Sequence, residues 1–133
     1  MIKSLDHINL TVKNLKESIE WYKNTFDFEL KEEGIYNGAP WGIIKSGEAM
    51  LCIYEHPEFE ALHEPRKHGT HGINHYSIRI QDKEAWLERI QEQNLKINYG
   101  GVVNWPHSES WYVNDPTGYE IEVVKWNEEK IQF

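Results

Sequence analysis

A repeated strand pattern constrains the fold of this 133-residue chain more than any other feature. Residues 5–12 (LDHINLTV) alternate in polarity, and residues 73–80 (INHYSIRI) repeat that alternation with a histidine at the same, third position. Such alternation is typical of a strand with two different faces. The repeat distance of about 68 residues is too long for a solenoid, and two copies are too few. We therefore expect two modules that pair around one shared core.

A helix is expected directly after each of these strands. Asn14 can cap a helix that ends near Thr25, with Glu17 at the third helical position, and apolar residues follow at helical spacing. Asp82 can cap a second helix that runs to about Gln93, where apolar side chains form a stripe. The two modules therefore begin alike, with a strand followed by a helix.

Three more strands are expected in each module, because short apolar runs are separated by glycine and proline. They are residues 28–32, 41–46 and 49–54 in the first module, and 96–99, 110–114 and 119–124 in the second. Between the last two, residues 115–118 (DPTG) predict a turn, since proline presets the second position and glycine suits the fourth. Each module then has the order β, α, β, β, β.

These elements predict one domain of the α+β class, made of two tandem βαβββ modules. Module one spans about residues 1–56, a polar linker that carries histidines spans 57–71, and module two spans about 72–126. A chain of this length buries roughly two-thirds of its unfolded surface, so it needs neither disulfides nor a structural metal to form a core.

Composition excludes several partners. The chain has 22 acidic against 14 Lys and Arg residues, a formal net charge of −8, whereas nucleic-acid binding needs clustered basic side chains. No segment approaches the ~18 apolar residues of a membrane span. Cys52 is the only cysteine, so a disulfide framework is impossible. We expect no nucleic-acid or membrane partner and a cytoplasmic location.

Three side chains are candidate metal ligands. His7 and His75 take equivalent places on the first strand of each module, and Glu122 lies on the last strand of the second. Alternation places Ile121 and Val123 under the helices, so Glu122 faces the other way. Two imidazoles and one carboxylate make a facial triad that leaves positions on a divalent metal open. The alternative is that all three are ordinary strand residues.

Several motifs spread over nearly the whole chain belong together. They are residues 5–12, Asn14-Leu15, Ser18, Trp21-Tyr22, His75, and residues 112–118 (YVNDPTG) leading to Glu122. Together they resemble the vicinal oxygen chelate superfamily, which includes glyoxalases, extradiol dioxygenases, fosfomycin-resistance thiol transferases and bleomycin-resistance proteins.

The resemblance implies both a fold and a site. The fold is a cupped, mostly antiparallel mixed sheet with the helices outside. The site is a divalent metal ion, with iron, manganese, zinc and nickel all open, held by His7, His75 and Glu122. The resemblance also implies a small-molecule substrate with two neighbouring oxygens and a homodimer.

Residues 112–122 are similar to the closing motif of extradiol dioxygenases. By that resemblance Tyr112 would hydrogen-bond an oxygen at the metal, and His107 would act as acid or base, although its spacing to Tyr112 is shorter than in the motif. Glu120 shares a face with Glu122 and is a candidate for supporting the ligands or for a general base. The alternatives are an exposed loop histidine and a carboxylate at the rim.

The other activities of the superfamily fit in part. Glyoxalases bring a second carboxylate from the last strand of module one, where this chain has Cys52, with Glu55 three residues further on. A fosfomycin-modifying enzyme would use Ser110 and Tyr112. A phosphonate substrate needs several cations near the metal, however, and the first strands of the two modules together supply only one, Arg79.

A non-catalytic drug-binding protein of the bleomycin-resistance type is the alternative from another class. The acidic charge and three tryptophans, Trp41, Trp105 and Trp111, would suit a groove for a cationic aromatic drug. An intact metal triad argues against it, because a binder has no use for one. The sequence thus favours a metal-dependent enzyme, leaning to dioxygenase chemistry, with a glyoxalase-like isomerase or lyase as the alternative reaction.

Overall fold

A computed structural model describes residues 1–56 and 72–131. The chain divides into two compact units, Met1–Ala61 and Leu62–Phe133, and each is described by itself. The predicted linker at 57–71 lies outside the described residues. In the part that is described, neither helix is long and apolar enough to cross a membrane.

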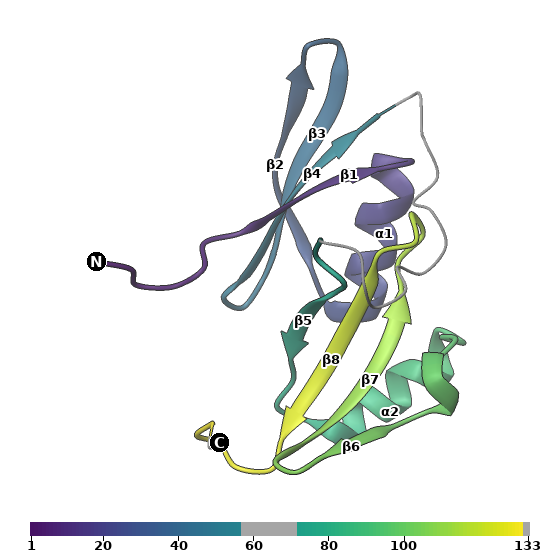
Figure 1. The fold of residues 1–133 in the computed structure, drawn as a ribbon. Coiled ribbons are helices and arrows are strands. Elements are labelled where there is room, and N and C mark those ends of the chain that lie inside the picture. The colour runs from purple at the N-terminus through teal and green to yellow at the C-terminus, as the bar shows by residue number, and fades with distance from the viewer. Residues whose placement is uncertain (57–71, 132–133) are drawn as a thin grey trace. The chain divides into compact units, whose positions relative to one another are not determined.

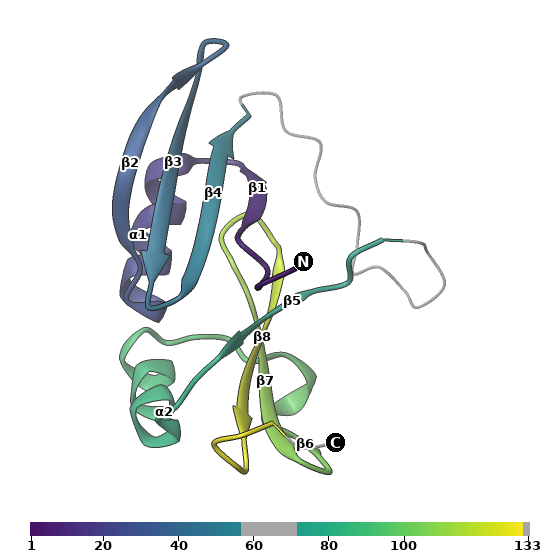
Figure 2. The ribbon, with the colours of Figure 1, turned by 90° about the vertical axis from the view of Figure 1, so that its left-hand side faces the viewer.

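The first unit is one four-stranded mixed sheet with one helix. Its elements are β1 (Ile8–Val12), α1 (Leu15–Phe26), β2 (Glu29–Tyr36), β3 (Ala39–Ser46) and β4 (Ala49–Glu55). The strand order is β1-β4-β3-β2, with β1 parallel to β4 and the other neighbours antiparallel. Figure 2 shows the four strands in this order, with α1 against one face.

The second unit repeats this arrangement. Its elements are β5 (Tyr76–Arg79), α2 (Lys83–Glu92), the short 3-10 helix η1 (Asn98–Gly100), β6 (Val103–Trp105), β7 (Ser108–Asn114) and β8 (Glu120–Trp126). The strand order β5-β8-β7-β6 is that of the first sheet, again with one parallel pair, β5 and β8 (Figure 1). The predicted α+β fold of two βαβββ modules is therefore confirmed.

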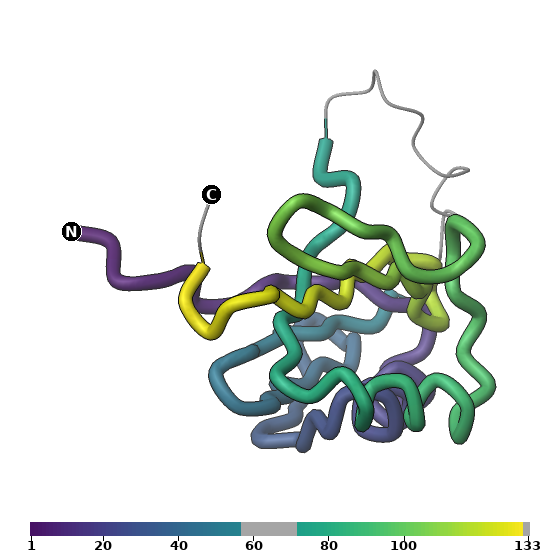
Figure 3. Tube along the Cα trace, turned by 90° about the horizontal axis from the view of Figure 1, so that it is seen from below, coloured from purple at the N-terminus to yellow at the C-terminus, as the bar shows by residue number. Residues whose placement is uncertain are grey.

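Because the strands pair in the same way in both units, single positions of one unit can be matched to positions of the other. Asn9 pairs with Cys52 in the first unit, and Ser77 pairs with Glu122 in the second. Cys52 therefore holds the position that corresponds to Glu122. The strands begin later than predicted, at Ile8 and Tyr76, so His7 and His75 each directly precede a strand and do not lie on it. Figures 1 and 3 show the chain before β1 as an extended run.

Both helices begin at the predicted caps. The side chain of Asn14 accepts a hydrogen bond from the amide of Glu17 at 2.8 Å, and that of Asp82 accepts one from Ala85 at 2.9 Å. Each bond satisfies an amide that the helix leaves without an intrahelical partner. In the tube of Figure 3 the turns of α1 and α2 stand out as the coiled parts of the chain.

Each sheet has one buried face. Tyr22 of α1 lies over the first sheet with Phe28, Ile44 and Ile53, which are at most 1% exposed. In the second unit the side chains of Ile121 and Val123 are fully buried, and Glu120 and Glu122 alternate with them on the half-buried face. Trp86 of α2 is 4% exposed and belongs to the core of this unit.

The strand predicted at residues 96–99 is wrong. Tyr99 has φ 56°, and Gly100 and Gly101 also have positive φ, so the backbone curls into η1. A left-handed conformation cannot continue a strand. The second strand of this unit along the chain is instead Val103–Trp105, which pairs with β7.

Candidate functional site

A tight turn sets the framework of the candidate site in the second unit. The side chain of Asp115 accepts hydrogen bonds from the amides of Thr117, Gly118 and Tyr119 at 2.8–3.0 Å, and Gly118 takes the positive φ of 107° that closes the turn. The predicted turn is thus confirmed. It joins β7 to β8 in a register that places Tyr112 directly opposite Glu122.

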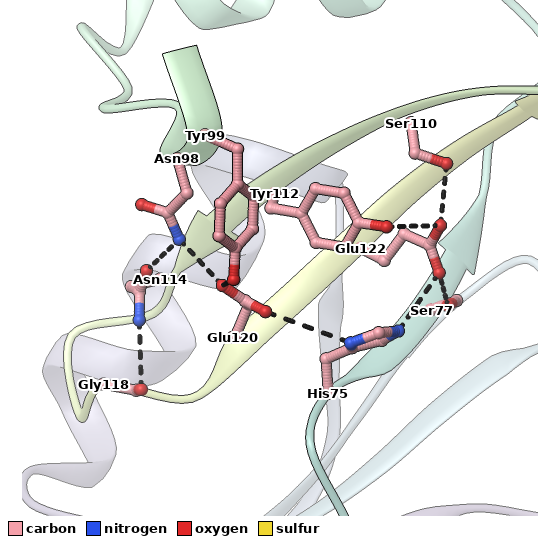
Figure 4. A network of polar contacts seen from close by, with 10 residues as sticks. All are labelled: His75, Ser77, Asn98, Tyr99, Ser110, Tyr112, Asn114, Gly118, Glu120 and Glu122. Carbon is pink, nitrogen blue, oxygen red and sulfur yellow. Dashed lines mark hydrogen bonds and ion pairs between the residues drawn. The ribbon is translucent and has the colours of Figure 1, made fainter. Parts of the chain in front are cut away.

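Glu122 accepts hydrogen bonds from three hydroxyl groups. The donors are Ser77 at 2.5 Å, Ser110 at 2.7 Å and Tyr112 at 3.1 Å, which come from β5 and β7 on its two sides (Figure 4). Burial raises the pKa of Glu122, but these bonds together with the His75 charge outweigh burial and hold the pKa below its ordinary value. The carboxylate is therefore ionised near neutral pH.

His75 lies between two carboxylates. Its Nε2 is 3.3 Å from Oε2 of Glu122, and its Nδ1 is 3.9 Å from Oε1 of Glu120 (Figure 4). The Tyr112 ring and the imidazole pack edge-to-face, with centroids 5.5 Å apart. A metal-binding histidine commonly turns its second ring nitrogen to a carboxylate, which orients the ring. The surroundings of His75 have that arrangement.

Glu120 is held in place by η1. The Tyr99 hydroxyl donates to Oε2 of Glu120 at 2.7 Å, and the amide nitrogen of Asn98 donates to the same oxygen at 3.1 Å. Asn98 also donates to Asn114 at 2.6 Å. The hydrogen bond to Glu120, with burial and the Glu120 charge, raises the pKa of Tyr99 to about 12, so Tyr99 remains a donor.

Sequence reasoning missed Asn98 and Tyr99 because it assigned them to a strand. The available signal was the pair Gly100–Gly101, which favours a turn directly after Tyr99. Tyr112, which the sequence analysis did name as a candidate, lies opposite Glu122 on the neighbouring strand. Burial, followed by the charge of Glu122, raises the pKa of Tyr112, while a hydrogen bond from the Trp105 side chain opposes the rise.

A pocket of about 410 Å³ opens beside Glu122. It is lined by Ser77, Trp105, Pro106, His107, Ser108, Glu122, Val124 and Trp126. The candidate acid or base His107 thus lies on the wall of the pocket that contains Glu122. Its backbone oxygen accepts a hydrogen bond from Asn127 at 3.0 Å, which fixes the turn between β6 and β7.

The remaining candidate, His7, belongs to the first unit and is described there. Its Nδ1 is 2.7 Å from a carboxylate oxygen of Asp6, so this histidine too has a carboxylate at one ring nitrogen.

Glu55 accepts a hydrogen bond from the amide of Leu15 at 2.8 Å and so supports the start of α1. Burial, with the Asp6 charge, raises the pKa of the Cys52 thiol.

The second unit therefore brings together His75, Glu120, Glu122 and Tyr112, with His107 on the same pocket. Across residues 1–56 and 72–131, no group of three or more His, Cys, Asp or Glu side chains is arranged to hold a metal ion. His75 and Glu122 form a pair, which offers one imidazole nitrogen and one ionised carboxylate, both suitable donors for a divalent ion.

Two curated relatives align along most of the chain. The metallothiol transferase FosB of Staphylococcus epidermidis is 25% identical over 124 residues, covering 92% of this chain and 81% of FosB. A catechol-2,3-dioxygenase of Bacillus subtilis is 26% identical over 123 residues, covering 90% of this chain and 40% of the dioxygenase.

Solved structures share the fold. A glyoxylase/bleomycin resistance protein/dioxygenase domain from Frankia sp. EAN1pec superposes with a TM-score of 0.79 at 16% identity, over 98% of this chain and 96% of that domain. The fosfomycin resistance protein FosX from Listeria monocytogenes, complexed with Mn(II) and sulfate, gives 0.70 at 23% identity, over 97% of each chain. A family model matches residues 4–123, and this chain belongs to the Glyoxalase/Bleomycin resistance protein/Dioxygenase superfamily.

Proposed function

We propose that this protein is a metal-dependent enzyme that binds a divalent ion through His7, His75 and Glu122 and acts on a small molecule with two neighbouring oxygens. Ring-cleaving dioxygenation is the leading reaction. The observation that carries the proposal is the pairing of His75 with an ionised Glu122, 3.3 Å apart, in a frame of hydrogen bonds. A divalent ion bound there would act as a Lewis acid toward the substrate oxygens.

The donor set fits such an ion. His75 has Glu120 on the side of Nδ1, and His7 has Asp6 at its own Nδ1, which leaves Nε2 of each ring for a ligand role. The ends of β1 and β5 where these histidines stand are equivalent by register. One nitrogen from each module and the Glu122 carboxylate make up the facial triad.

The polar groups around Glu122 favour a substrate without a phosphonate. Its hydrogen-bond donors, Ser77, Ser110 and Tyr112, are neutral hydroxyls. Three cations of the second unit bind elsewhere. Arg79 donates to the backbone of Glu129, Lys83 donates to Glu109 at 2.6–2.7 Å, and Lys125 donates to the backbone of Trp126.

Two residues of the second unit would act on substrate in this proposal. Tyr112, whose raised pKa keeps its proton, would redirect its hydroxyl from Glu122 to a nearby substrate oxygen and donate a hydrogen bond to it. His107, on the wall of the same pocket, would accept or return a proton from a substrate hydroxyl. Glu120 would act through His75 by fixing its ring.

Thiol transfer is the second candidate, because FosB, a metallothiol transferase, is similar over 92% of this chain. A glyoxalase-like isomerase is weaker, since the position equivalent to Glu122 holds the Cys52 thiol, whose pKa is raised, and Glu55 supports α1. A thiol that keeps its proton is a poor substitute for a ligating carboxylate. A non-catalytic drug-binding protein is the remaining alternative.

An activity panel separates these candidates. Metal-free protein is loaded with iron(II) under nitrogen, and oxygen uptake is measured with a set of catechols. Parallel samples with manganese(II) receive fosfomycin and a thiol, and the thiol adduct is followed by mass spectrometry. We expect one oxygen molecule consumed per ring cleaved, and no adduct. Adduct formation without oxygen uptake would establish thiol transfer, and loaded protein inactive in both assays would favour the drug-binding alternative.

Replacing Glu120 by glutamine tests its positioning role. The amide keeps the size of the side chain but removes the charge next to Nδ1 of His75, and loss of such a partner typically weakens metal affinity by roughly 10–100-fold. We expect a loss of that size for manganese(II), measured by competition with a metal indicator. Thermal unfolding of the metal-free variant should change little.

Glu109→Gln is the matched control. Glu109 is also a carboxylate of the second sheet, but it pairs with Lys83. Its variant should bind manganese(II) like the wild type. Equal manganese(II) affinities for Glu120→Gln and wild type would contradict the positioning role of Glu120. An equal loss of affinity in Glu120→Gln and Glu109→Gln would show that the change in net charge alone explains it.

A further inference from the structure

We propose that Tyr99 is a positioning residue of the candidate site, which acts through Glu120 to fix the ring of His75. This inference rests on the proposed function for the use of His75 as a ligand, and it adds a residue from η1, which contains none of the motif residues. Its basis is the place of Tyr99 beside Glu120 and Tyr112, two side chains that lie against the His75 imidazole (Figure 4).

The two oxygens of Glu120 have separate partners. Oε2 accepts hydrogen bonds from the Tyr99 hydroxyl at 2.7 Å and from Asn98 at 3.1 Å, while Oε1 lies 3.9 Å from Nδ1 of His75. A separation of 3.9 Å is that of an ion pair and exceeds a hydrogen bond, so the imidazole alone holds Glu120 only loosely. The direction of the carboxylate is therefore set by the donors from η1.

The backbone of Tyr99 has a conformation that tyrosine rarely adopts. Its φ of 56° and ψ of 21° lie in the left-handed region, where a Cβ crowds the backbone and glycine has no such conflict. Glycine at position 99 would make the same turn without strain, so the turn by itself does not explain a tyrosine here. Strained residues persist where surrounding contacts hold them, and they cluster at functional sites.

Core packing does not explain Tyr99 either. The residue is 66% exposed, and its ring packs edge-to-face against that of Tyr112, with centroids 5.0 Å apart. The Tyr112 ring in turn packs against the His75 imidazole at 5.5 Å. Tyr99 thus reaches His75 by two routes, a polar one through Glu120 and an aromatic one through Tyr112.

The hydroxyl of Tyr99 can be removed while the other bonds of η1 remain. Asn98 donates to Asn114 at 2.6 Å, and the Gly101 amide donates to the backbone oxygen of Asn98 at 3.3 Å. Neither bond involves the Tyr99 side chain. Phenylalanine at position 99 therefore removes the donor to the carboxylate and keeps both the turn and the aromatic ring.

Metal affinity and NMR of the imidazole test the inference together. Tyr99→Phe should weaken manganese(II) binding by about two- to tenfold, the range of one hydrogen bond, which is less than the loss expected for Glu120→Gln. Adding Tyr99→Phe to Glu120→Gln should change the affinity by less than about twofold, because two residues that act in series are not additive. In metal-free, isotope-labelled protein, the ring nitrogen signals of His75, identified by their absence in His75→Ala, should shift in Tyr99→Phe.

Tyr36→Phe is the matched control. Tyr36 lies on β2 of the first unit, is 61% exposed and packs edge-to-face with Tyr54 at 6.4 Å. Its variant therefore also removes the hydroxyl of an exposed tyrosine whose ring packs on another ring. This variant should keep the wild-type manganese(II) affinity and the wild-type His75 signals.

Unchanged affinity and unchanged His75 signals in Tyr99→Phe would overturn the inference. Additive losses in the double variant would overturn it as well, and so would an equal loss of affinity in Tyr36→Phe. Shifted His75 signals in a protein that binds no metal would support the positioning role and refute the proposed function. Metal binding that Tyr99→Phe leaves at full strength, with unshifted His75 signals, would do the reverse.

Discussion

Substitution of His75 by alanine is expected to abolish metal binding. Wild-type protein made without a histidine tag should retain about one equivalent of transition metal per chain after dialysis, as a single facial triad predicts. Loss of a supporting carboxylate already weakens such a site by roughly 10–100-fold, so loss of a ligand should exceed about 100-fold. Metal content is measured by elemental analysis, and affinity by competition with an indicator.

Glu122→Gln should lose metal to the same degree for a different reason. The amide keeps the acceptor oxygen and the size of the side chain, but it removes the charge that attracts a divalent ion. The hydroxyls of Ser77, Ser110 and Tyr112 hold the carboxylate ionised, so glutamine changes the charge of a group that is charged in the native protein. His7→Ala completes the set, because His7 is the ligand expected from module one.

Other histidines provide the control. His56 directly follows β4 and is not among the expected ligands, so His56→Ala should keep the full equivalent of metal. Stoichiometric metal that survives in both His7→Ala and His75→Ala would refute the triad. Binding that disappears only in His75→Ala and Glu122→Gln would place the ion in the second unit alone, without His7.

Local sequence patterns predicted most of the fold. The alternation before Val12 and before Ile80 located the first strand of each module, and Asn14 and Asp82 located the helix starts. These signals work because they come from a strand's period of two and from the need of a helix amide for a partner. Repetition of the pattern then predicted the duplicated topology.

The errors share a physical cause, which is that contacts distant in sequence decide them. Residues 96–99 have a strand-like composition, but Tyr99 reaches Glu120 and Asn98 reaches Asn114, and these bonds hold the turn at η1. In the same way Glu55 finds a partner in Leu15, 40 residues earlier. A pattern read along a short window contains neither partner.

The candidate site was predicted only in part, because some of its contacts also join residues that are distant in sequence. Alternation along β8 placed Glu120 and Glu122 on one face, and the structure has them there. The three hydroxyl donors of Glu122 depend instead on the register of β5, β8 and β7, which pairs Ser77 and Tyr112 with Glu122 from its two sides. Register depends on how two strands pair, so a single sequence predicts it only weakly.

Substitution of Asp115 by alanine is expected to cause the largest loss of stability. The Asp115 side chain is 5% exposed and accepts three backbone hydrogen bonds in the turn between β7 and β8. Alanine would remove the acceptor that the three amides share, although the Gly118 amide would keep its second acceptor, the backbone oxygen of Asp115, at 3.0 Å. Hydrogen bonds to a charged group contribute about 1.5–3 kcal/mol each at most, and they are not additive, so we expect a loss of about 3 kcal/mol. Urea unfolding of the metal-free protein measures it.

Asp115→Asn is the matched control, because the amide oxygen of asparagine can still accept from Thr117, Gly118 and Tyr119. Its loss of unfolding free energy should stay near 1 kcal/mol, roughly the cost of replacing a charged acceptor by a neutral one. The same variants test how the turn serves the site. A slip of one residue between β7 and β8 would turn Tyr112 away from Glu122, since alternate side chains face opposite sides. Under conditions where Asp115→Ala is still folded, its metal affinity should therefore fall more than that of Asp115→Asn. Unfolding free energies of alanine and asparagine variants that agree within experimental error would show that the carboxylate oxygen is not what holds this turn.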